Sequence, residues 1–185
     1  MLASAVLVLV ACGGDDTTSS TTTSATTAGG DCDAIEEVDV GPVTHVDGGL
    51  TADDYPTNPP AGGDHYDPAT AGSRVYTEPQ PYGETVHFLE HGAVIGWTNG
   101  LSAADQAAVE KEFNGLIQEG YYQVAVVENP DLDVPFALSA WGALQTCATF
   151  DAAAIRPFVE EWYASPKTPE GGLACQGDAR TLPNC

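Results

Sequence analysis

The chain has 185 residues, of which 27 are acidic and only 5 are Lys or Arg, so its formal net charge at pH 7 is -22 with histidine neutral. A surface of this kind repels the phosphates of nucleic acids and anionic lipid headgroups, while it concentrates cations. We therefore expect no nucleic-acid partner. Two explanations of the acidity stay open, namely the solubility of an exported protein and the collection of cations.

The chain begins with an apolar run that ends at Cys12 and is followed at once by Gly and Asp residues. A short apolar segment before small residues is typical of a signal peptide, whereas a transmembrane helix needs about 20 apolar residues. We predict that residues 1–11 are a lipoprotein signal and that Cys12 is lipidated, which anchors the protein outside the cytoplasm on the bacterial membrane. An ordinary secretory signal is the alternative. The lack of Lys or Arg before the apolar run leaves open whether Met1 is the true start.

Residues 12–31 consist almost entirely of Gly, Ser, Thr, Ala and Asp. A segment with so few large apolar side chains cannot offset the entropy of ordering its backbone. We predict a flexible tether here, followed by one globular domain over residues 32–185, which is long enough to bury a core.

Residues 40–81 contain seven of the thirteen prolines together with many glycines, and they predict an extended, loop-rich segment. Further along the chain, β-branched and aromatic runs predict three strands, and the last of them has a possible bend at Gly142. These strands cover Ala93–Trp97, Tyr121–Glu128 and Phe136–Thr146.

Two helices are predicted beside these strands. The first covers Ala103–Glu119, with Ser102 as its amino-terminal cap and Gly120 at the position of a carboxy-terminal cap. The second lies between Asp151 and Ala164, but Pro157 interrupts its hydrogen-bond ladder, so that helix could begin only at Pro157. Together the elements predict an α+β fold, in which a small, mostly antiparallel sheet is covered by two helices and edged by the loop segment.

Besides Cys12, the chain has four cysteines, Cys32, Cys147, Cys175 and Cys185. An even number of cysteines in an exported domain indicates disulfides, and four cysteines allow three pairings. We favour Cys175 with Cys185, which closes a short loop in the tail, and Cys32 with Cys147. The alternative for Cys147 is a soft metal ligand, although no CxxC spacing supports it.

All four histidines lie between positions 45 and 91, in Thr44-His45-Val46, in Asp64-His65-Tyr66 and in the stretch from His87 to His91. Imidazole is the commonest side-chain ligand of zinc and copper, and unlike a thiolate it resists oxidation outside the cytoplasm. We therefore predict a metal site built from His45, His65, His87 and His91, with Glu90 as a further ligand or an orienting group. The alternative is a set of histidines that only hydrogen-bond to backbone.

The local structure around His87 decides between these possibilities. Glu84 to His91 contains no Pro or Gly and precedes Gly92, so it could be a short helix in which His87, Glu90 and His91 share one face. In a straight strand, by contrast, His87 and His91 would lie about 13 Å apart. HxxEH is also the motif of the inverted zinc peptidases, for which Glu160 or Glu161 would be the third ligand.

At these residues the chain resembles a known bacterial group, the domain-of-unknown-function family 3105. The resemblance covers roughly Gly41 to Tyr163 and departs from the family pattern at Ala61–Asp64 and in the tail after Pro169. Its members are exported or membrane-anchored and have no assigned activity, so the resemblance implies a fold and a location rather than a reaction. The matching motifs are Thr44–Val46, Tyr55–Pro60, Gly63–Tyr66, Val86–Gly92, Ala140–Gly142, Cys147 and Phe150–Asp151.

Three functions follow as hypotheses. The first is binding of a zinc or copper ion at the cell envelope. The second is a module without metal that recognises an envelope protein through tyrosines of the loop segment. The third is a small metallohydrolase, in which Glu90 would act beside an open coordination position. The tyrosines of the second hypothesis are Tyr55, Tyr66, Tyr76 and Tyr82.

Overall fold

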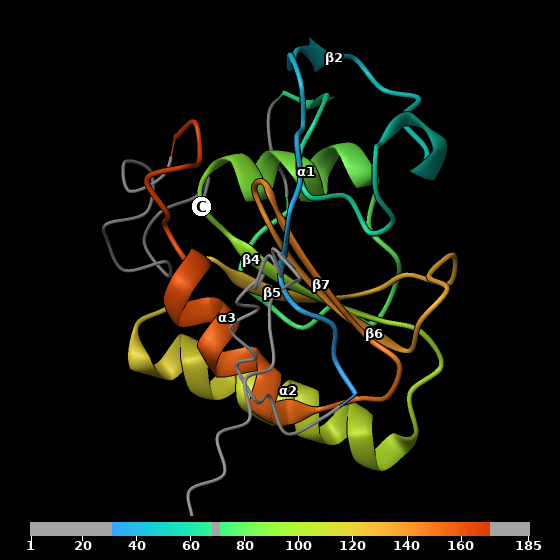
Figure 1. Ribbon diagram of the computed structural model, residues 1–185, viewed down its shortest axis with the longest axis vertical. Coiled ribbons are helices and arrows are strands. Elements are labelled where there is room, and N and C mark those ends of the chain that lie inside the picture. The colour runs from blue at the N-terminus through green and yellow to red at the C-terminus, as the bar shows by residue number, and fades with distance from the viewer. Residues whose placement is uncertain (1–30, 68–70, 171–185) are drawn as a thin grey trace, which may run out of the picture.

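The structure, a computed structural model, describes residues 31–67 and 71–170 (Figure 1). Its centre is a five-stranded sheet in the order β1-β7-β6-β4-β5, in which only β4 and β5 run parallel to each other. This sheet and the three helices packed on it confirm the α+β prediction. The strands are β1 (Glu36–Glu37), β4 (Val94–Thr98), β5 (Val124–Glu128), β6 (Phe136–Ala140) and β7 (Ala143–Cys147).

The sheet is covered on both faces, because side chains alternate along a strand. On β4, Val94 packs on one face with helices α2 (Ala103–Glu119) and α3 (Ile155–Trp162). The next residue, Ile95, packs on the other face with helix α1 (Tyr82–Glu90). Figure 1 shows α1 on one side of the strands and α2 with α3 on the other. The two helices that were predicted to cover the sheet are α2 and α3, and both lie on the same face. The other face is covered by a third helix, α1.

Helix α2 has the predicted bounds because its signals are local. The Ser102 side chain accepts a hydrogen bond from the Asp105 backbone N–H, and Gly120 ends the helix in the left-handed conformation with φ 107°. The helix buries Phe113 completely against the sheet. Gly96 on β4 makes this approach possible, since a Cβ there would lie 2.7 Å from the Phe113 ring.

The strand predicted over Ala93–Trp97 lies one residue later, over Val94–Thr98, and three other predictions differ more. The strand predicted to start at Tyr121 begins at Val124. The bent strand predicted from Phe136 is a hairpin of β6 and β7, and Gly142, with φ 74°, supplies the turn that reverses the chain. Helix α3 begins at Ile155, so the start at Pro157 is wrong; this proline lies in the first turn, where its missing N–H costs no helical hydrogen bond.

A disulfide joins Cys32 to Cys147 across 115 residues and ties the start of the described chain to β7. This pairing was predicted, and it rules out Cys147 as a thiolate metal ligand. The other predictions for cysteines, lipid on Cys12 and the Cys175–Cys185 bridge, lie outside the described residues.

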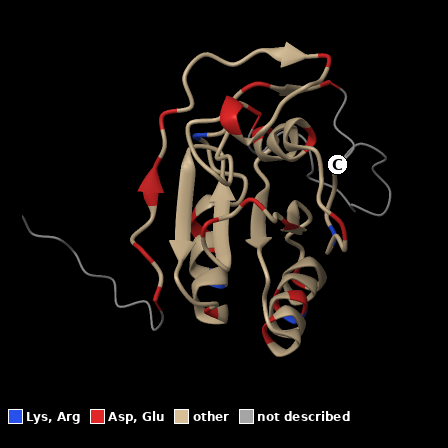
Figure 2. Cartoon of the chain, turned by 90° about the vertical axis from the view of Figure 1, so that its right-hand side faces the viewer, with Lys and Arg blue, Asp and Glu red and all other residues tan. Residues whose placement is uncertain are grey.

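The loop-rich segment from residue 40 to 81 contains only two very short strands and one 3-10 turn, Ala52–Asp54, in its described part. The strands β2 (His45–Val46) and β3 (His65–Tyr66) pair in parallel, with His45 opposite His65. Figure 2 shows acidic residues on β1, on helices and on loops, with few Lys or Arg among them. Within the described ranges, every helix is too short or too polar to cross a membrane.

Candidate metal centre

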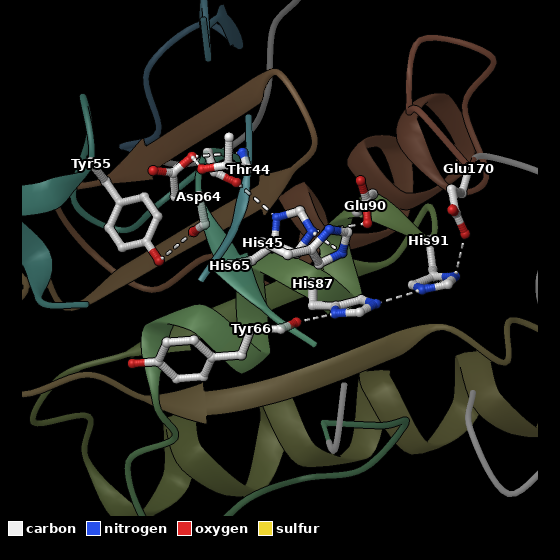
Figure 3. A network of polar contacts seen from close by, with 11 residues as sticks. Thr44, His45, Tyr55, Asp64, His65, Tyr66, His87, Glu90, His91 and Glu170 are labelled. Carbon is white, nitrogen blue, oxygen red and sulfur yellow. Dashed lines mark hydrogen bonds and ion pairs between the residues drawn. The ribbon is translucent and has the colours of Figure 1, made fainter. Parts of the chain in front are cut away.

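Three separate elements bring the four histidines together, as Figure 3 shows. His45 and His65 come from the paired strands β2 and β3, while His87 lies in α1 and His91 follows directly after it. His65 is fully buried, His87 and Glu90 are buried, and His45 is exposed. The cluster therefore reaches from the protein interior to the surface at His45.

The stretch around His87 is a helix, which is the geometry that the metal hypothesis required. Helix α1 starts at Tyr82, two residues earlier than the predicted stretch, and Gly92 follows it with φ 88°. One helical turn separates His87 from His91, and their Nε2 atoms lie 2.9 Å apart. The two rings are stacked with centroids 4.9 Å apart.

Asp64 joins the two strands that carry His45 and His65. Its Oδ1 accepts hydrogen bonds from the Thr44 backbone N–H at 2.8 Å and from the Thr44 hydroxyl at 3.0 Å. The His65 backbone N–H in turn donates to the Thr44 carbonyl at 3.2 Å. Asp64 thus holds His45 beside His65.

Two glycines allow this turn to lie close to its neighbours. Gly62 and Gly63 have φ values of 128° and 129°, which side chains rarely adopt. A Cβ on Gly62 would lie 2.7 Å from Val40, and one on Gly63 would lie 3.1 Å from the Tyr55 ring. Both the backbone conformation and the available space therefore favour glycine at these two positions, just before Asp64 and the His65 strand.

Backbone carbonyls determine which nitrogen of two histidines carries the proton. His65 Nδ1 lies 2.9 Å from the Gly63 carbonyl, and His87 Nδ1 contacts the Tyr66 carbonyl. A carbonyl only accepts, so each Nδ1 must donate and each Nε2, in the neutral ring, presents its lone pair to the cluster. This is the tautomer in which Nε2 can bind a metal.

The Nε2 atom of His65 lies close to two other atoms that could bind a metal. It is 3.1 Å from His45 Nε2 and 3.0 Å from the Glu90 carboxylate. Ligands around a tetrahedral zinc with bonds of about 2.0–2.1 Å lie roughly 3.3 Å from one another. The spacing within the cluster is therefore close to that of a metal site.

The donor atoms form two groups that could each hold a metal ion. One contains His45, His65 and His87, and the other contains His87, Glu90 and His91; within each group the atoms lie within 4.8 Å of one another. All five predicted ligand residues are thus brought together. They form two groups that share His87, rather than one group of five.

His91 has an environment of its own at the end of α1. Burial lowers the pKa of its imidazole below the ordinary value, and His87 lowers the pKa further, while Glu170 and Glu90 oppose this shift. The neutral ring, which is the form that binds a metal, is therefore favoured at neutral pH. Its Nδ1 lies 3.4 Å from the Glu170 carboxylate, a residue that no sequence motif singled out.

The third ligand expected for a zinc peptidase lies elsewhere. Glu160 and Glu161 are exposed on α3, and Glu160 pairs with Arg156 at 3.7 Å. Neither belongs to the donor groups found in the described part of the chain. The assignment of Glu160 or Glu161 as a ligand is therefore wrong.

The four tyrosines of the interaction hypothesis have their hydroxyls hydrogen-bonded to other residues of the protein. Tyr55 donates to the Asp64 carbonyl, and Tyr82 donates to the Asn129 side chain. The Tyr66 hydroxyl accepts from Leu50, and that of Tyr76 bonds to Gly72. These tyrosines support the loop segment, and none of the four is fully exposed.

The fold and the site together define an α+β protein with a partly buried histidine–glutamate cluster that could hold a metal ion. The family model described as "Protein of unknown function (DUF3105)" matches residues 48–177, and the chain belongs to this family. The matched region contains every donor residue of the cluster except His45, which lies just before it. No curated protein and no solved structure matches the chain.

Proposed function

We propose that this protein binds a transition-metal ion, zinc or copper(II), through its histidine cluster. The observation that carries the proposal is that lone pairs face each other inside the cluster. Because His65 Nδ1 donates to a carbonyl, the Nε2 lone pair of the neutral ring faces the Glu90 carboxylate oxygen at 3.0 Å. Two acceptors at this distance repel each other unless a cation lies between them.

A second conflict of this kind arises at His87 and His91 when His91 carries its proton on Nδ1, beside Glu170. His87 Nδ1 donates to the Tyr66 carbonyl, so its Nε2 lone pair faces His91 Nε2 at 2.9 Å. A proton bridging each pair would relieve the two conflicts separately. A divalent ion bound to several of these atoms relieves them with a single group, and the acidic chain favours its approach.

The donor set points to zinc or copper(II). Imidazole nitrogen suits both ions, and a carboxylate is an ordinary additional ligand of zinc. Both cysteines in the described part of the chain are joined in a disulfide, and Met1 is the only methionine of the sequence. The soft sulfur ligands that copper(I) prefers are therefore not available in this cluster.

The position of Glu90 favours a role in metal binding over a role as the base of a hydrolase. Its side chain is buried and directed at His65, and in this position it acts as a metal ligand or orients one. A hydrolytic base needs to reach a substrate-bound water beside the ion. We therefore propose a metal-binding protein rather than a hydrolase.

We also propose that the protein works outside the cytoplasm, attached through lipid on Cys12. The Cys32–Cys147 disulfide supports this location, because such bonds persist in oxidising compartments. Cys12 and the signal before it lie outside the described residues, so the support comes from the disulfide and the sequence. Mass spectrometry of the amino-terminal peptide from the native host tests the lipid.

Titration of the purified, untagged protein with zinc and with copper(II) tests the metal proposal. His87 belongs to both donor groups, so His87→Ala should abolish tight binding whichever group holds the ion. His45→Ala and His91→Ala each damage one group, and the larger loss identifies the one that is occupied. Glu161→Ala is the matched control, because it removes an exposed charge on α3.

Tight binding by the wild type and the control, with loss in His87→Ala, is the expected result. If neither ion bound the wild-type protein, or if His87→Ala bound as tightly as the control, the proposal would be wrong. Circular dichroism of each variant establishes that it is folded before its affinity is compared.

A further inference from the structure

The described chain returns to the histidine cluster after α3. Beyond α3, the Ala164 backbone N–H donates to the Gly92 carbonyl at 2.8 Å, and the Glu170 N–H donates to the Glu90 carbonyl at 3.2 Å. Between these two contacts, Lys167 pairs with Glu37 on β1 at 2.9 Å. Backbone hydrogen bonds at both ends therefore fix this segment against the end of α1, and they bring the Glu170 side chain to His91.

His91, which is partly buried, differs from the buried His65 and His87 in what its Nδ1 faces. That atom is buried and makes no hydrogen bond in the described structure, and the Glu170 carboxylate lies at ion-pair distance from it, 3.4 Å away. His65 and His87 instead direct Nδ1 at backbone carbonyls. In all three rings, Nδ1 thus faces an oxygen that only accepts, while Nε2 faces the cluster.

We propose, on the basis of the metal-binding function proposed above, that Glu170 is a positioning residue for the metal site. Its carboxylate holds the His91 imidazole in the form that carries the proton on Nδ1. Nε2 is thereby left as a lone pair directed at His87, 2.9 Å away. Glu170 makes no contribution as a ligand; it acts through His91.

Carboxylates commonly serve metal-binding histidines in this way. A hydrogen bond from the second ring nitrogen sets the tautomer and ring orientation and raises the basicity of the ligand, and its loss typically weakens metal affinity 10–100-fold. The ordinary alternative is a surface ion pair of little consequence, because the Glu170 side chain is 52% exposed. The burial of His91 Nδ1 argues against this alternative, since a buried ring nitrogen needs a partner and the Glu170 carboxylate lies 3.4 Å from it.

Two variants of Glu170 separate these explanations. Glu170→Ala removes the acceptor, and we expect the affinity for zinc to fall about 10–100-fold. Glu170→Gln keeps an acceptor oxygen without the charge, so it should retain most of the affinity. Glu161→Ala, which removes one exposed acidic side chain from α3, should bind zinc like the wild type.

The tautomer of His91 supplies a second readout that needs no metal. Nitrogen-15 chemical shifts of the metal-free protein at pH 8 distinguish a proton on Nδ1 from one on Nε2. The wild type, Glu170→Gln and Glu161→Ala should carry the proton on Nδ1 of His91, whereas Glu170→Ala should shift it toward Nε2. A merely structural role for Glu170 would leave this signal unchanged.

An unchanged tautomer in Glu170→Ala would overturn the proposal, and so would wild-type zinc affinity in that variant. If instead the wild type bound neither zinc nor copper(II), the metal-binding function itself would fail, and the tautomer signal would still decide whether Glu170 holds His91. The two failures are therefore distinguishable.

Discussion

The two faces of the central sheet are covered in different ways. On one face, α2 and α3 bury side chains that are almost all apolar, among them Phe113 and Phe158. On the other face, α1 and the loop segment also bury apolar residues such as Trp97, but they enclose His65 and Glu90 as well. The first face has the composition of an ordinary core. The second face contains buried polar groups, which need hydrogen-bond partners or a bound ion.

The two faces should therefore contribute differently to the stability of the fold and to metal binding. Apolar burial stabilises the fold wherever it occurs. A buried imidazole or carboxylate, in contrast, costs free energy unless hydrogen bonds or an ion satisfy it. We therefore expect changes on the α2–α3 face to alter the free energy of unfolding, and changes on the α1 face to alter metal affinity.

The largest effect on stability is expected from Phe113→Ala. The Phe113 ring is fully buried on the α2–α3 face, and truncation of a buried Phe costs about 3–5 kcal/mol. Urea unfolding should show this loss, while the folded fraction should bind zinc with wild-type affinity. A parallel loss of affinity would show that the two faces are coupled.

Gly83→Ala should lower both the free energy of unfolding and the zinc affinity. A Cβ at Gly83 would lie 2.5 Å from the Tyr66 ring, so Tyr66 must move, and overpacking of this kind costs about 1–3 kcal/mol. The Tyr66 carbonyl contacts His87 Nδ1, so zinc affinity should also fall.

Gly115→Ala in α2 is the matched control for this substitution. Apart from the neighbouring backbone of its own helix, no atom lies within 4 Å of a Cβ at that position, and alanine favours a helix by up to about 1 kcal/mol over glycine. The control should therefore be as stable as the wild type or more stable, with unchanged affinity. Equal behaviour of the two variants in urea unfolding and zinc titration would contradict the close contact at Tyr66.

Asp64→Ala should have a smaller effect on stability. It removes the acceptor for two hydrogen bonds from Thr44, which together contribute about 1–2 kcal/mol. We expect weaker zinc binding as well, because His45 follows Thr44 directly. Asp64→Asn keeps an acceptor oxygen and should preserve most of both properties in calorimetric titration and urea unfolding.

The smallest effect is expected from the surface pair of Arg156 and Glu119. The hydrogen bond from Arg156 lowers the pKa of the Glu119 carboxyl below its ordinary value of 4.5. The pair therefore stabilises the folded state above pH 4.5, and this contribution disappears as the pH falls through the lowered pKa. Both side chains are largely exposed, so solvent screens the pair.

Arg156→Gln should consequently differ little from the wild type in thermal unfolding at pH 7. The small difference should vanish at acid pH and in high salt. A difference that grew as the pH fell would contradict the assigned direction of the Glu119 pKa.

Helix α2 could be predicted because its signals are local, whereas the sequence left the stretch around His87 open between a short helix and a strand. Ser102 and Gly120 mark the ends of α2 within its own sequence, and the spacing of His87 and His91 has meaning only in a helix. The hairpin between β6 and β7 was read as one strand, because its turn at Gly142 lacks the Asn-Gly or Asp-Gly pair that marks tight hairpins.

The parts of the site that could not be predicted depend on contacts between distant segments. Asp64 and Gly83 acquire their roles only after the loop segment packs on α1. Glu170 reaches His91 only because the chain after α3 returns to that helix. The sequence indicated which residues could bind a metal, whereas the fold shows what orients them.

X-ray absorption spectroscopy of the zinc-loaded protein is the most direct test of the central claim. We expect at least two imidazole ligands, three if His45, His65 and His87 hold the ion, with zinc–nitrogen bonds near 2.0–2.1 Å and the multiple-scattering pattern of histidine. In Glu161→Ala this spectrum should be unchanged, and in His87→Ala it should be lost. A zinc ion surrounded only by oxygen, as in water or at surface carboxylates, would contradict the claim that the histidine cluster is a metal site.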